Sequence, residues 1–276
     1  MIALVACALI FSAKASGEPL GCDPKAMAGV SEIYPTSDSL PENILRFYVY
    51  FDAPMRKEAA LPQITLEDED GARIDGALLA NHYDLWSPDG TRLTLLLDPG
   101  RVKTGLEASE QLGSAIERGR RYKLIIGAGL QTARGCKLGV PHLKSFMATA
   151  PDVSAPDPER WEIAPPPWGS RDALKVRLDG FHDHISLAYR IRVQTNSGDT
   201  LPGRIDVAAG ETEWRFTPQA PWRTGDFLLK VDPLLEDVAG NRLTGLFDSP
   251  SGENRRRQDS AASINLSFSI HPSNDD

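Results

Sequence analysis

The feature that most constrains this chain is an alternation of apolar and polar residues with a period of two. It is clearest at Leu174–Asp179, Tyr189–Gln194, Trp214–Thr217 and Phe227–Asp232, and the odd positions of Leu45–Phe51 form one apolar face. Successive side chains of a strand point to opposite faces, so each run offers one face to a core and one to water. The pattern predicts antiparallel sheets, because strands of a parallel sheet are usually apolar on both faces.

Turn residues separate these runs. Asp70-Gly71, Asp89-Gly90 and Ser197-Gly198 are hairpin-type dipeptides, and 21 prolines and 23 glycines divide the chain at short intervals. One stretch, Glu107–Arg118, has apolar residues spaced by four and glycines near both ends, which predicts a short helix. The sequence therefore predicts an all-β chain with one helical insertion.

The second half of the chain repeats the first. Four segments occur in the same order in both halves, and a similar turn closes each half. The pairs are Leu45–Phe51 with Leu174–Leu178, Glu67–Gly71 with Asn196–Asp199, Arg92–Asp98 with Glu213–Thr217, and Tyr122–Ile126 with Phe227–Val231. A diverged duplication explains this order, and the helical stretch at 107–118 is an insertion in the first copy.

The repeat sets the expected domain limits. We expect one module at residues 31–150 and a second at 161–272, each long enough to bury its own core. Residues 151–160 contain three prolines and few apolar side chains, which predicts a short, stiff linker. Residues 16–30 form an N-terminal segment ahead of the first module.

The N-terminus carries a signal for export. Residues Ile2–Ala13 are almost entirely apolar, and Ala13-Lys14-Ala15 matches the small-x-small pattern of signal peptidase, which predicts a signal peptide at residues 1–15. No Lys or Arg precedes the apolar run. A lipid anchor at Leu4–Cys7 or Pro19–Cys22 is the alternative, and it would be the only contact with a membrane. We expect a periplasmic, extracellular or envelope-associated protein.

Removal of residues 1–15 would leave two cysteines, Cys22 and Cys136. An even number of cysteines in an exported chain favours a disulfide between them. Two unpaired thiols are the alternative, since the geometry of the pair cannot be read from the sequence.

Two short stretches resemble a known family. Glu42–Met55 reads ENILRFYVYFDAPM and Leu235–Leu243 reads LEDVAGNRL. They resemble the opening strand and the Asp-x-Ala-Gly-Asn turn of bacterial immunoglobulin-like domains of the S-layer-associated (SbsA-like) type. The first module departs from the pattern at Thr132–Cys136, and the second departs at Leu178–His184. The resemblance implies two tandem antiparallel immunoglobulin-like β-sandwiches joined by a short Pro-rich linker, used as a spacer, adhesion or scaffold module, with no catalytic residue.

Charge and motifs exclude several classes of function. The net charge of −8 and the pI near 5.2 argue against nucleic acid as a partner, and Arg255–Arg257 is interpreted as a solvated loop. Nucleophile elbows, zinc-protease helices and phosphate-binding loops are absent from the sequence. Gly127-Ala128-Gly129 lacks the third glycine and the helix of a dinucleotide site, so we interpret it as a turn.

Two clusters resemble metal sites. His182-Asp183-His184 could supply zinc ligands, but no third ligand has a clear spacing, and a polar loop is the favoured interpretation. Glu67–Gly71 resembles the start of a calcium loop, but position 12 of such a loop would be Leu79. Weak calcium binding, with Asp237 as a second candidate, stays an alternative to an acidic hairpin tip.

The sequence thus predicts a non-catalytic module without a cofactor, whose partner is a protein or polysaccharide of the cell envelope. The alternative is a glycan-binding module or an accessory part of a polysaccharide-processing system. It rests on the five tryptophans, whose rings could stack on sugar rings. Trp214 is expected in a core, and three others are expected to pack near the module junction. The tryptophans are Trp86, Trp161, Trp168, Trp214 and Trp222.

Overall fold

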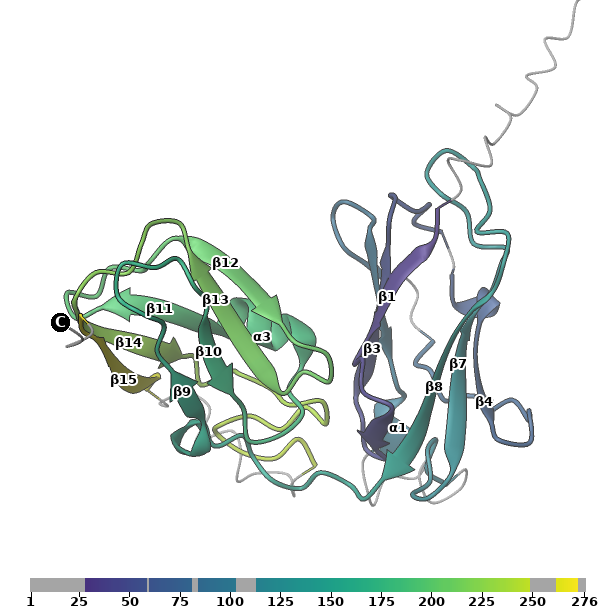
Figure 1. The fold of residues 1–276 in the computed structure, drawn as a ribbon. Helices are drawn as coiled ribbons and strands as arrows, with labels where there is room; N and C mark the ends of the chain where they lie inside the picture. The colour runs from purple at the N-terminus through teal and green to yellow at the C-terminus, as the bar shows by residue number, and fades with distance from the viewer. Residues whose placement is uncertain (1–27, 59, 81–83, 103–112, 249–261, 273–276) are drawn as a thin grey trace, which may run out of the picture.

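The alternating runs form strands, and the strands build two β-sandwiches that lie side by side (Figure 1). The computed structural model describes residues 28–58, 60–80, 84–102, 113–248 and 262–272. The strands of the first sandwich are β1 (Val30–Tyr34), β2 (Ser39–Pro41), β3 (Arg46–Phe51), β4 (Ile64–Asp68), β5 (Leu85–Trp86), β6 (Arg92–Leu96), β7 (Arg121–Ile126) and β8 (His142–Thr149). The strands of the second are β9 (Glu162–Ala164), β10 (Leu174–Arg177), β11 (Ile191–Thr195), β12 (Gly203–Val207), β13 (Glu213–Pro218), β14 (Gly225–Val231) and β15 (Ile264–Ile270).

Helical segments in the described part of the chain are short. They are the helices α1 (Pro99–Val102) and α3 (His184–Arg190) and the 3-10 turns η2 (Leu61–Gln63) and η3 (Pro158–Arg160). None of the described helices has the length and the apolar character needed to cross a membrane. The predicted signal peptide at residues 1–15 lies outside the described residues.

The strand order is the same in both sandwiches. One sheet of the first sandwich has the order β1-β3-β6-β5, and the matching sheet of the second has the order β9-β10-β13-β12. The other sheets are β4-β7-β8-β2 and β11-β14-β15, so β2 has no counterpart among the described strands. All pairs are antiparallel except β2 with β8, which runs parallel. The all-β sandwich fold expected from the sequence is confirmed.

The turns that follow β7 and β14 support the duplication at the level of single hydrogen bonds. In the first copy the Thr132 N–H donates to Cys136 O at 2.8 Å, and Gly135 N–H donates to Thr132 O at 2.8 Å. In the second copy the same two bonds join Asp237 with Asn241 at 3.0 Å and Gly240 with Asp237 at 3.1 Å. The middle glycines have φ values of +87° and +80°, a conformation that favours glycine. We call residues 237–241 the closing turn.

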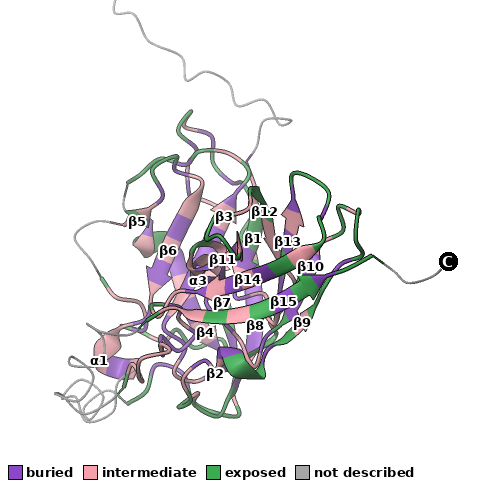
Figure 2. Cartoon of the chain, turned by 90° about the vertical axis from the view of Figure 1, so that its left-hand side faces the viewer, coloured by how far each residue is buried: buried purple, intermediate pink, exposed green. Residues whose placement is uncertain are grey.

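Each sandwich has its own hydrophobic core (Figure 2). Phe47, Tyr122 and Phe146 are among the largest buried side chains of the first core. Trp214, which is fully buried, and Phe216 stack in the second core with ring centroids 6.1 Å apart. The inward face of each alternating run therefore fills a core, as the period of two predicts.

Strand β3 departs from the simple alternation because both of its faces are covered. Its odd residues enter the first core, but Tyr48 on the even face is also buried, at 4 % exposure. The even face was expected to meet water, and this prediction was wrong. It packs against the second sandwich, which lies beside β3 in Figure 1.

The described part of the predicted helix at 107–118 is not helical. Residues 113–118 form bends and a turn, and residues 107–112 lie outside the described part. The Arg101 guanidinium donates hydrogen bonds to the carbonyls of Gly113, at 3.1 Å, and Ser114, at 3.2 Å. Ile116 is fully buried in the first core. In this segment, hydrogen bonds from the Arg101 side chain and the packing of Ile116 in the core thus take the place of the hydrogen bonds of a helix.

A helix that the sequence pattern did not predict precedes β11. Asp183 caps α3, since its carboxylate accepts a hydrogen bond from Ser186 N–H at 2.8 Å. Tyr189 and Arg190, expected in a strand, belong to this helix, and the strand starts at Ile191. In Figure 1, α3 lies on the side of the second sandwich that faces β1 and β3.

Candidate functional site

The most elaborate arrangement of polar side chains lies where the two sandwiches meet, and we call this contact the junction. Tyr48 on β3 donates a hydrogen bond to Asp183 Oδ2 at 2.8 Å, and Asp183 is 4 % exposed. Arg46 Nη2 lies 2.5 Å from Glu236 Oε2, and Arg46 Nε lies 3.7 Å from Asp183 Oδ2. The polar side chains of the junction are Thr36, Arg46, Tyr48, Asp183, Glu211 and Glu236.

Burial and neighbouring charges shift the pKa values of this cluster. Burial raises the pKa of the Asp183 carboxyl, and the Arg46 guanidinium acts in the opposite direction. Burial and the Asp183 carboxylate both raise the pKa of Tyr48, which therefore stays a hydrogen-bond donor. The cluster joins the first sandwich to the second through side chains that are buried away from water. An unpaired polar atom in such a place would cost free energy of folding.

A second contact of the junction joins Thr36 with Glu211. The Glu211 carboxylate accepts hydrogen bonds from Thr36 N–H at 2.9 and 3.0 Å and from the Thr36 hydroxyl at 2.7 Å. The Thr36 Oγ1 in turn accepts a bond from Gly210 N–H at 2.6 Å. Glu211 has no exposed surface and a φ of +50°, which is rare for a residue other than glycine. A strained, fully buried carboxylate at this place indicates that the surrounding contacts determine its position.

An aromatic contact completes the junction. The rings of Tyr34 on β1 and His184 at the start of α3 are stacked, with centroids 3.5 Å apart and an angle of 20°. Burial and the nearby Arg92 guanidinium lower the pKa of His184 to about 4. The imidazole is therefore neutral at physiological pH and packs as an aromatic ring.

The closing turn joins the linker to both sandwiches. Leu45 N–H donates to Val238 O at 2.9 Å, and Val238 is part of the first core. The Asn241 amide donates to the carbonyl of Asp152 at 3.2 Å, and Asn43 of the first sandwich donates to the same carbonyl at 2.8 Å. The turn that resembles the SbsA-like pattern therefore lies at the junction.

This geometry makes Gly240 a test of the junction. A Cβ at Gly240 would lie 2.6 Å from Leu45 Cδ2 of the other sandwich, whereas a Cβ at Gly198, with a similar φ of +92°, would meet nothing within 4 Å. We expect Gly198→Ala to cost about 1 kcal/mol for its backbone conformation. Gly240→Ala should cost about 1–3 kcal/mol more, because the buried Leu45 side chain of the other sandwich must also move. Urea unfolding of both variants measures the difference, and equal losses would show that the contact does not bear on stability.

The two histidines of the candidate zinc cluster point to different neighbours. His182 is 1 % exposed, its Nδ1 lies 3.0 Å from Gly180 O, and its ring packs edge-on against Trp161. His184 stacks on Tyr34 instead. Across the described residues, no group of three or more His, Cys, Asp or Glu side chains has the arrangement of a metal site. The interpretation of this stretch as a polar loop was wrong in part, because His182 and Asp183 are buried and His184 is the first residue of α3.

The acidic hairpin after β4 is neutralised within the first sandwich. Arg120 Nη2 lies 3.0 Å from Asp68 Oδ2 and 3.5 Å from Asp70 Oδ2, and Arg120 Nε lies 3.3 Å from Glu69 Oε1. The backbone N–H groups of residues 70 and 72 also donate to Asp68. Asp237, the second calcium candidate, accepts bonds from the N–H groups of Ala239 and Asn241 within its own turn. Asp68 and Asp237 thus have hydrogen-bond donors within the protein, and weak calcium binding at either place stays a prediction.

The glycines of the candidate dinucleotide motif pack against another turn. Gly127 N–H donates to Gln63 O at 2.7 Å, and a Cβ at Gly127 would lie 2.6 Å from the same oxygen. A Cβ at Gly129 would lie 2.1 Å from Gln63 Oε1. Both positions exclude a side chain for reasons of packing, and no helix follows them.

The tryptophans do not form a platform for sugar rings. Trp161, Trp214 and Trp222 are buried, as expected for core and packing residues, and Trp86 is partly buried against the first core. Trp168, also expected to pack, is instead 52 % exposed. The alternative of a glycan-binding module needs at least two exposed rings on one surface, which these five do not supply.

The predicted disulfide involves one described residue. Cys136 is 7 % exposed and is disulfide-bonded. Cys22 lies outside the described residues, so its pairing with Cys136 stays a prediction.

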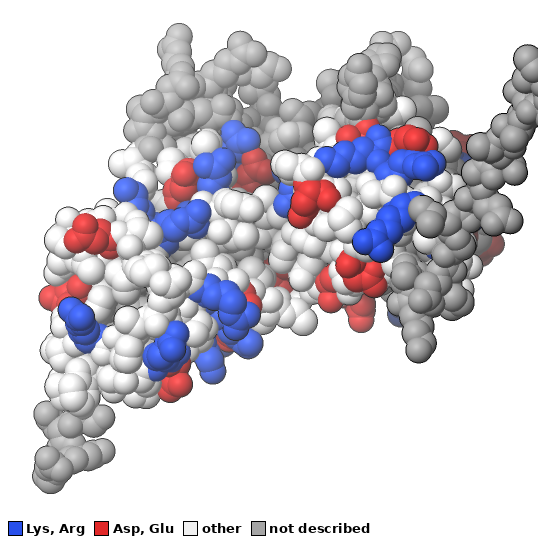
Figure 3. Space-filling view, turned by 90° about the horizontal axis from the view of Figure 1, so that it is seen from above, with Lys and Arg blue, Asp and Glu red and all other residues white. Residues whose placement is uncertain are grey.

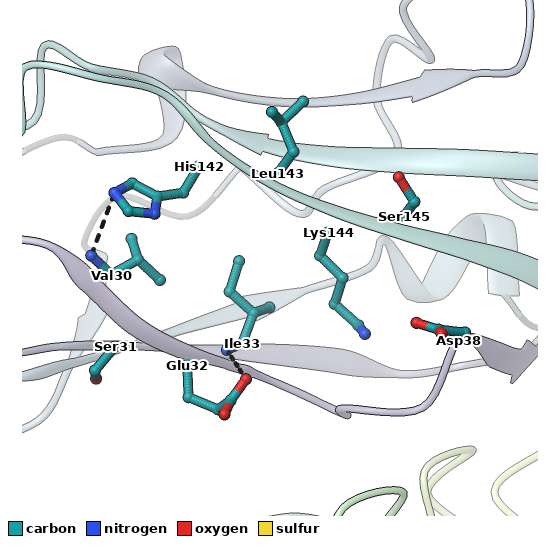
Figure 4. Close-up of a pocket in the computed structure, with 9 residues that line it drawn as sticks. All are labelled: Val30, Ser31, Glu32, Ile33, Asp38, His142, Leu143, Lys144 and Ser145. Atoms are coloured by element: carbon teal, nitrogen blue, oxygen red, sulfur yellow. Dashed lines mark hydrogen bonds between the residues drawn. The ribbon is translucent and has the colours of Figure 1, made fainter.

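A polar hollow of about 300 Å³ lies between β1 and the first half of β8 (Figure 4). Ile33 and Lys144 point into it from the two strands. Lys144 is 8 % exposed and donates to Ser37 O at 3.0 Å. Burial lowers the pKa of Lys144, and the carboxylates of Asp38 and Glu211 act in the opposite direction. The Ser37 carbonyl is next to Thr36 in the chain, so the hollow borders the Thr36–Glu211 contact. Two carboxylates, of Glu32 and Asp38, line the hollow together with the Lys144 ammonium group.

The surface seen in Figure 3 carries basic and acidic side chains next to one another. No patch of a single charge dominates this view. Sequence reasoning missed the junction residues. The one available signal was the even face of β3, where Arg46, Tyr48 and Tyr50 are bulky for a face that meets water.

A comparison with family models and with curated proteins found no match to this sequence. Among solved structures, the S-layer protein SbsC is similar over 89 % of this chain and 26 % of its own, with 10 % identity and a TM-score of 0.31. Domains MG0-NIE-MG1 of Escherichia coli alpha-2-macroglobulin match 75 % of this chain and 66 % of theirs, with 13 % identity and a TM-score of 0.28. A chimeric titin Z1Z2 matches 71 % of this chain and 85 % of its own, with 10 % identity and a TM-score of 0.26. This chain therefore spans about a quarter of the SbsC chain, and these distant likenesses assign it no function.

Proposed function

We propose that this protein is a non-catalytic, exported module of the cell envelope or extracellular space that serves adhesion, assembly or spacing. Its two modules, with limits at residues 31–150 and 161–272, would act as one rigid unit. The observation that carries the proposal is the junction, where Asp183 and Glu211 are buried between the sandwiches and hydrogen-bonded to Tyr48 and Thr36 of the first. A flexible tether between independent modules would not need buried polar contacts of this kind.

The apolar run at residues 2–13 supports export, and the tandem sandwiches support a role in presenting surfaces at a fixed distance. At the junction, Asp183 and Glu211 are hydrogen-bonded to Tyr48 and Thr36 of the first sandwich, and beside the hollow Lys144 donates to Ser37 O. The expected partner is a protein or polysaccharide of the envelope.

Small-angle X-ray scattering of the full chain tests rigidity directly. We expect one arrangement of the two sandwiches, and a scattering curve that stays unchanged from low to physiological salt. The junction is buried, so screening of surface charges should not loosen it. The variant Glu211→Ala should broaden the distribution of distances between the sandwiches, whereas Glu213→Ala on the surface of β13 should not. A broad distribution for the unmodified chain would contradict the proposal.

Affinity capture tests the role in the envelope. The tagged protein should retain a protein or polysaccharide from envelope fractions, and capture should fall when the junction is opened by Glu211→Ala. Failure to retain any envelope component would count against a role in adhesion or assembly. Spacing would then be the one role of the three that remains.

A further inference from the structure

One sheet of the second sandwich lacks a strand that its counterpart has. In the first sandwich β2 pairs with the outer edge of β8, where Ser39–Pro41 run beside Met147–Thr149. The matching sheet has only three strands, and within the described residues no strand pairs with the outer edge of β15. The turn η3 lies close to β15 but is not a strand of this sheet. Among the described strands, the second copy therefore has no counterpart of β2.

The sequence of β15 carries none of the usual protection of a sheet edge. Ile264–Ile270 reads INLSFSI, with seven residues and no charge and no proline. Natural proteins commonly place Lys, Pro or a bulge on such edges, because an unpaired row of N–H and C=O groups invites another strand. Phe268 and Ile270 are buried, but Ile264 and Leu266 on the same face are only partly buried. A further strand would cover these two side chains.

We propose that the edge of β15 is the site at which two copies of this protein associate, by antiparallel pairing of β15 with β15 about a two-fold axis. The inference rests on the proposed role in assembly and names the partner. Pairing over the full strand centres on Ser267 and places Asn265 opposite Ser269 of the second copy. All three exposed side chains are neutral, so the edge meets itself without repulsion between like charges. The two three-stranded sheets become one sheet of six strands.

The position of β15 is compatible with this contact. In Figure 1 the strand lies on the side of the second sandwich away from the first, so pairing there leaves the junction untouched. One pair of strands covers less surface than a standard stable interface, and the association should therefore be reversible and depend on concentration.

Sedimentation velocity of the full chain tests the inference. We expect the average mass to rise toward twice that of the monomer as the concentration increases. Ser267→Lys should stay monomeric, because it places two ammonium groups opposite each other. Gln219→Lys, an exposed position at the end of β13, adds the same charge elsewhere and should associate like the unmodified protein.

A mixed sample makes the test specific for position and direction. Ser267→Glu should also be monomeric alone, but an equimolar mixture of Ser267→Lys and Ser267→Glu should associate, because opposite charges meet across the axis. Circular dichroism checks that each variant is folded. If a Ser267 variant does not fold, the double variant Asn265→Asp with Ser269→Asp takes its place, because it brings two carboxylates opposite each other in the paired strands. An unmodified chain that is monomeric at all concentrations, or a mixture that does not associate, would overturn the inference. If scattering shows that the unmodified chain is monomeric and rigid, the proposed function stands and only the pairing of β15 with β15 is wrong.

Discussion

Asp183→Ala is expected to lower the free energy of unfolding by about 3–5 kcal/mol, the range for breaking a buried ion pair by removing one partner. The carboxylate of Asp183 does three things at once. It caps α3 through Ser186 N–H, accepts the Tyr48 hydroxyl and lies beside Arg46. Its loss leaves buried donors on both sandwiches without an acceptor. Urea unfolding followed by tryptophan fluorescence and circular dichroism measures the loss.

Two companion variants separate these contributions. Asp183→Asn keeps an oxygen for the cap and loses only the charge, so we expect a smaller loss of about 1–2 kcal/mol. Tyr48→Phe removes one hydroxyl, and a double-mutant cycle of Tyr48→Phe with Asp183→Asn gives the coupling between the sandwiches. If Asp183→Ala were no more harmful than Tyr48→Phe, the charge at this position would contribute nothing to the junction.

Acidification is expected to destabilise the protein through His184, by up to about 3 kcal/mol between pH 6.5 and 4. The pKa of His184 is about 4 in the folded chain, because burial and Arg92 oppose protonation, whereas the unfolded imidazole titrates near its ordinary value of 6.5. Between these values the unfolded state binds the proton. The free energy of unfolding therefore falls as pH decreases through this window. Burial lowers the pKa of His182 as well, which acts in the same direction.

His184→Phe isolates this effect, because a phenyl ring can still stack on Tyr34 but does not titrate. Burial raises the pKa values of Asp183 and Glu211, and that of Asp237 to about 8, which gives these carboxyls the opposite dependence on pH. Their contribution is present in both proteins and cancels in the comparison. Urea midpoints at pH 7, 6, 5 and 4.5 should show the unmodified protein losing stability relative to His184→Phe as the pH decreases. Parallel pH profiles would show that His184 is not the group responsible.

The sandwich fold could be predicted because its information is local. The alternation in Leu174–Asp179 or Phe227–Asp232 identifies both the strand and the face that enters the core, as the buried Val176 and Leu229 confirm. The duplication could be predicted for the same reason, since the order of segments along the chain survives divergence. The strand orders, which differ only by β2 among the described strands, and the matching turns after β7 and β14 agree with it.

The junction could not be predicted in the same way, because its contacts join residues far apart in sequence. Thr36 and Glu211 are 175 positions apart, and nothing near either residue reveals the other. The seven residues of α3 are too few for a helical period to show, so the alternation of Tyr189–Gln194 was extended into the helix. At 113–118 the spacing of apolar residues predicted a helix that the structure does not have. Contacts with Arg101 and with the core determine the conformation there. Both errors arise where tertiary contacts outweigh local preference.

The way the linker is held has a mechanical consequence. Asp152 exchanges two hydrogen bonds with Asn43 of the first sandwich, and its carbonyl also accepts from Asn241 of the closing turn. A pulling force that draws the two sandwiches apart would act on these amide contacts and on the junction together. If these contacts break before the ladders of either sandwich, the two folded units separate without unfolding. A protein stretched between two anchors in this way would lengthen in one step and close again once the tension is removed.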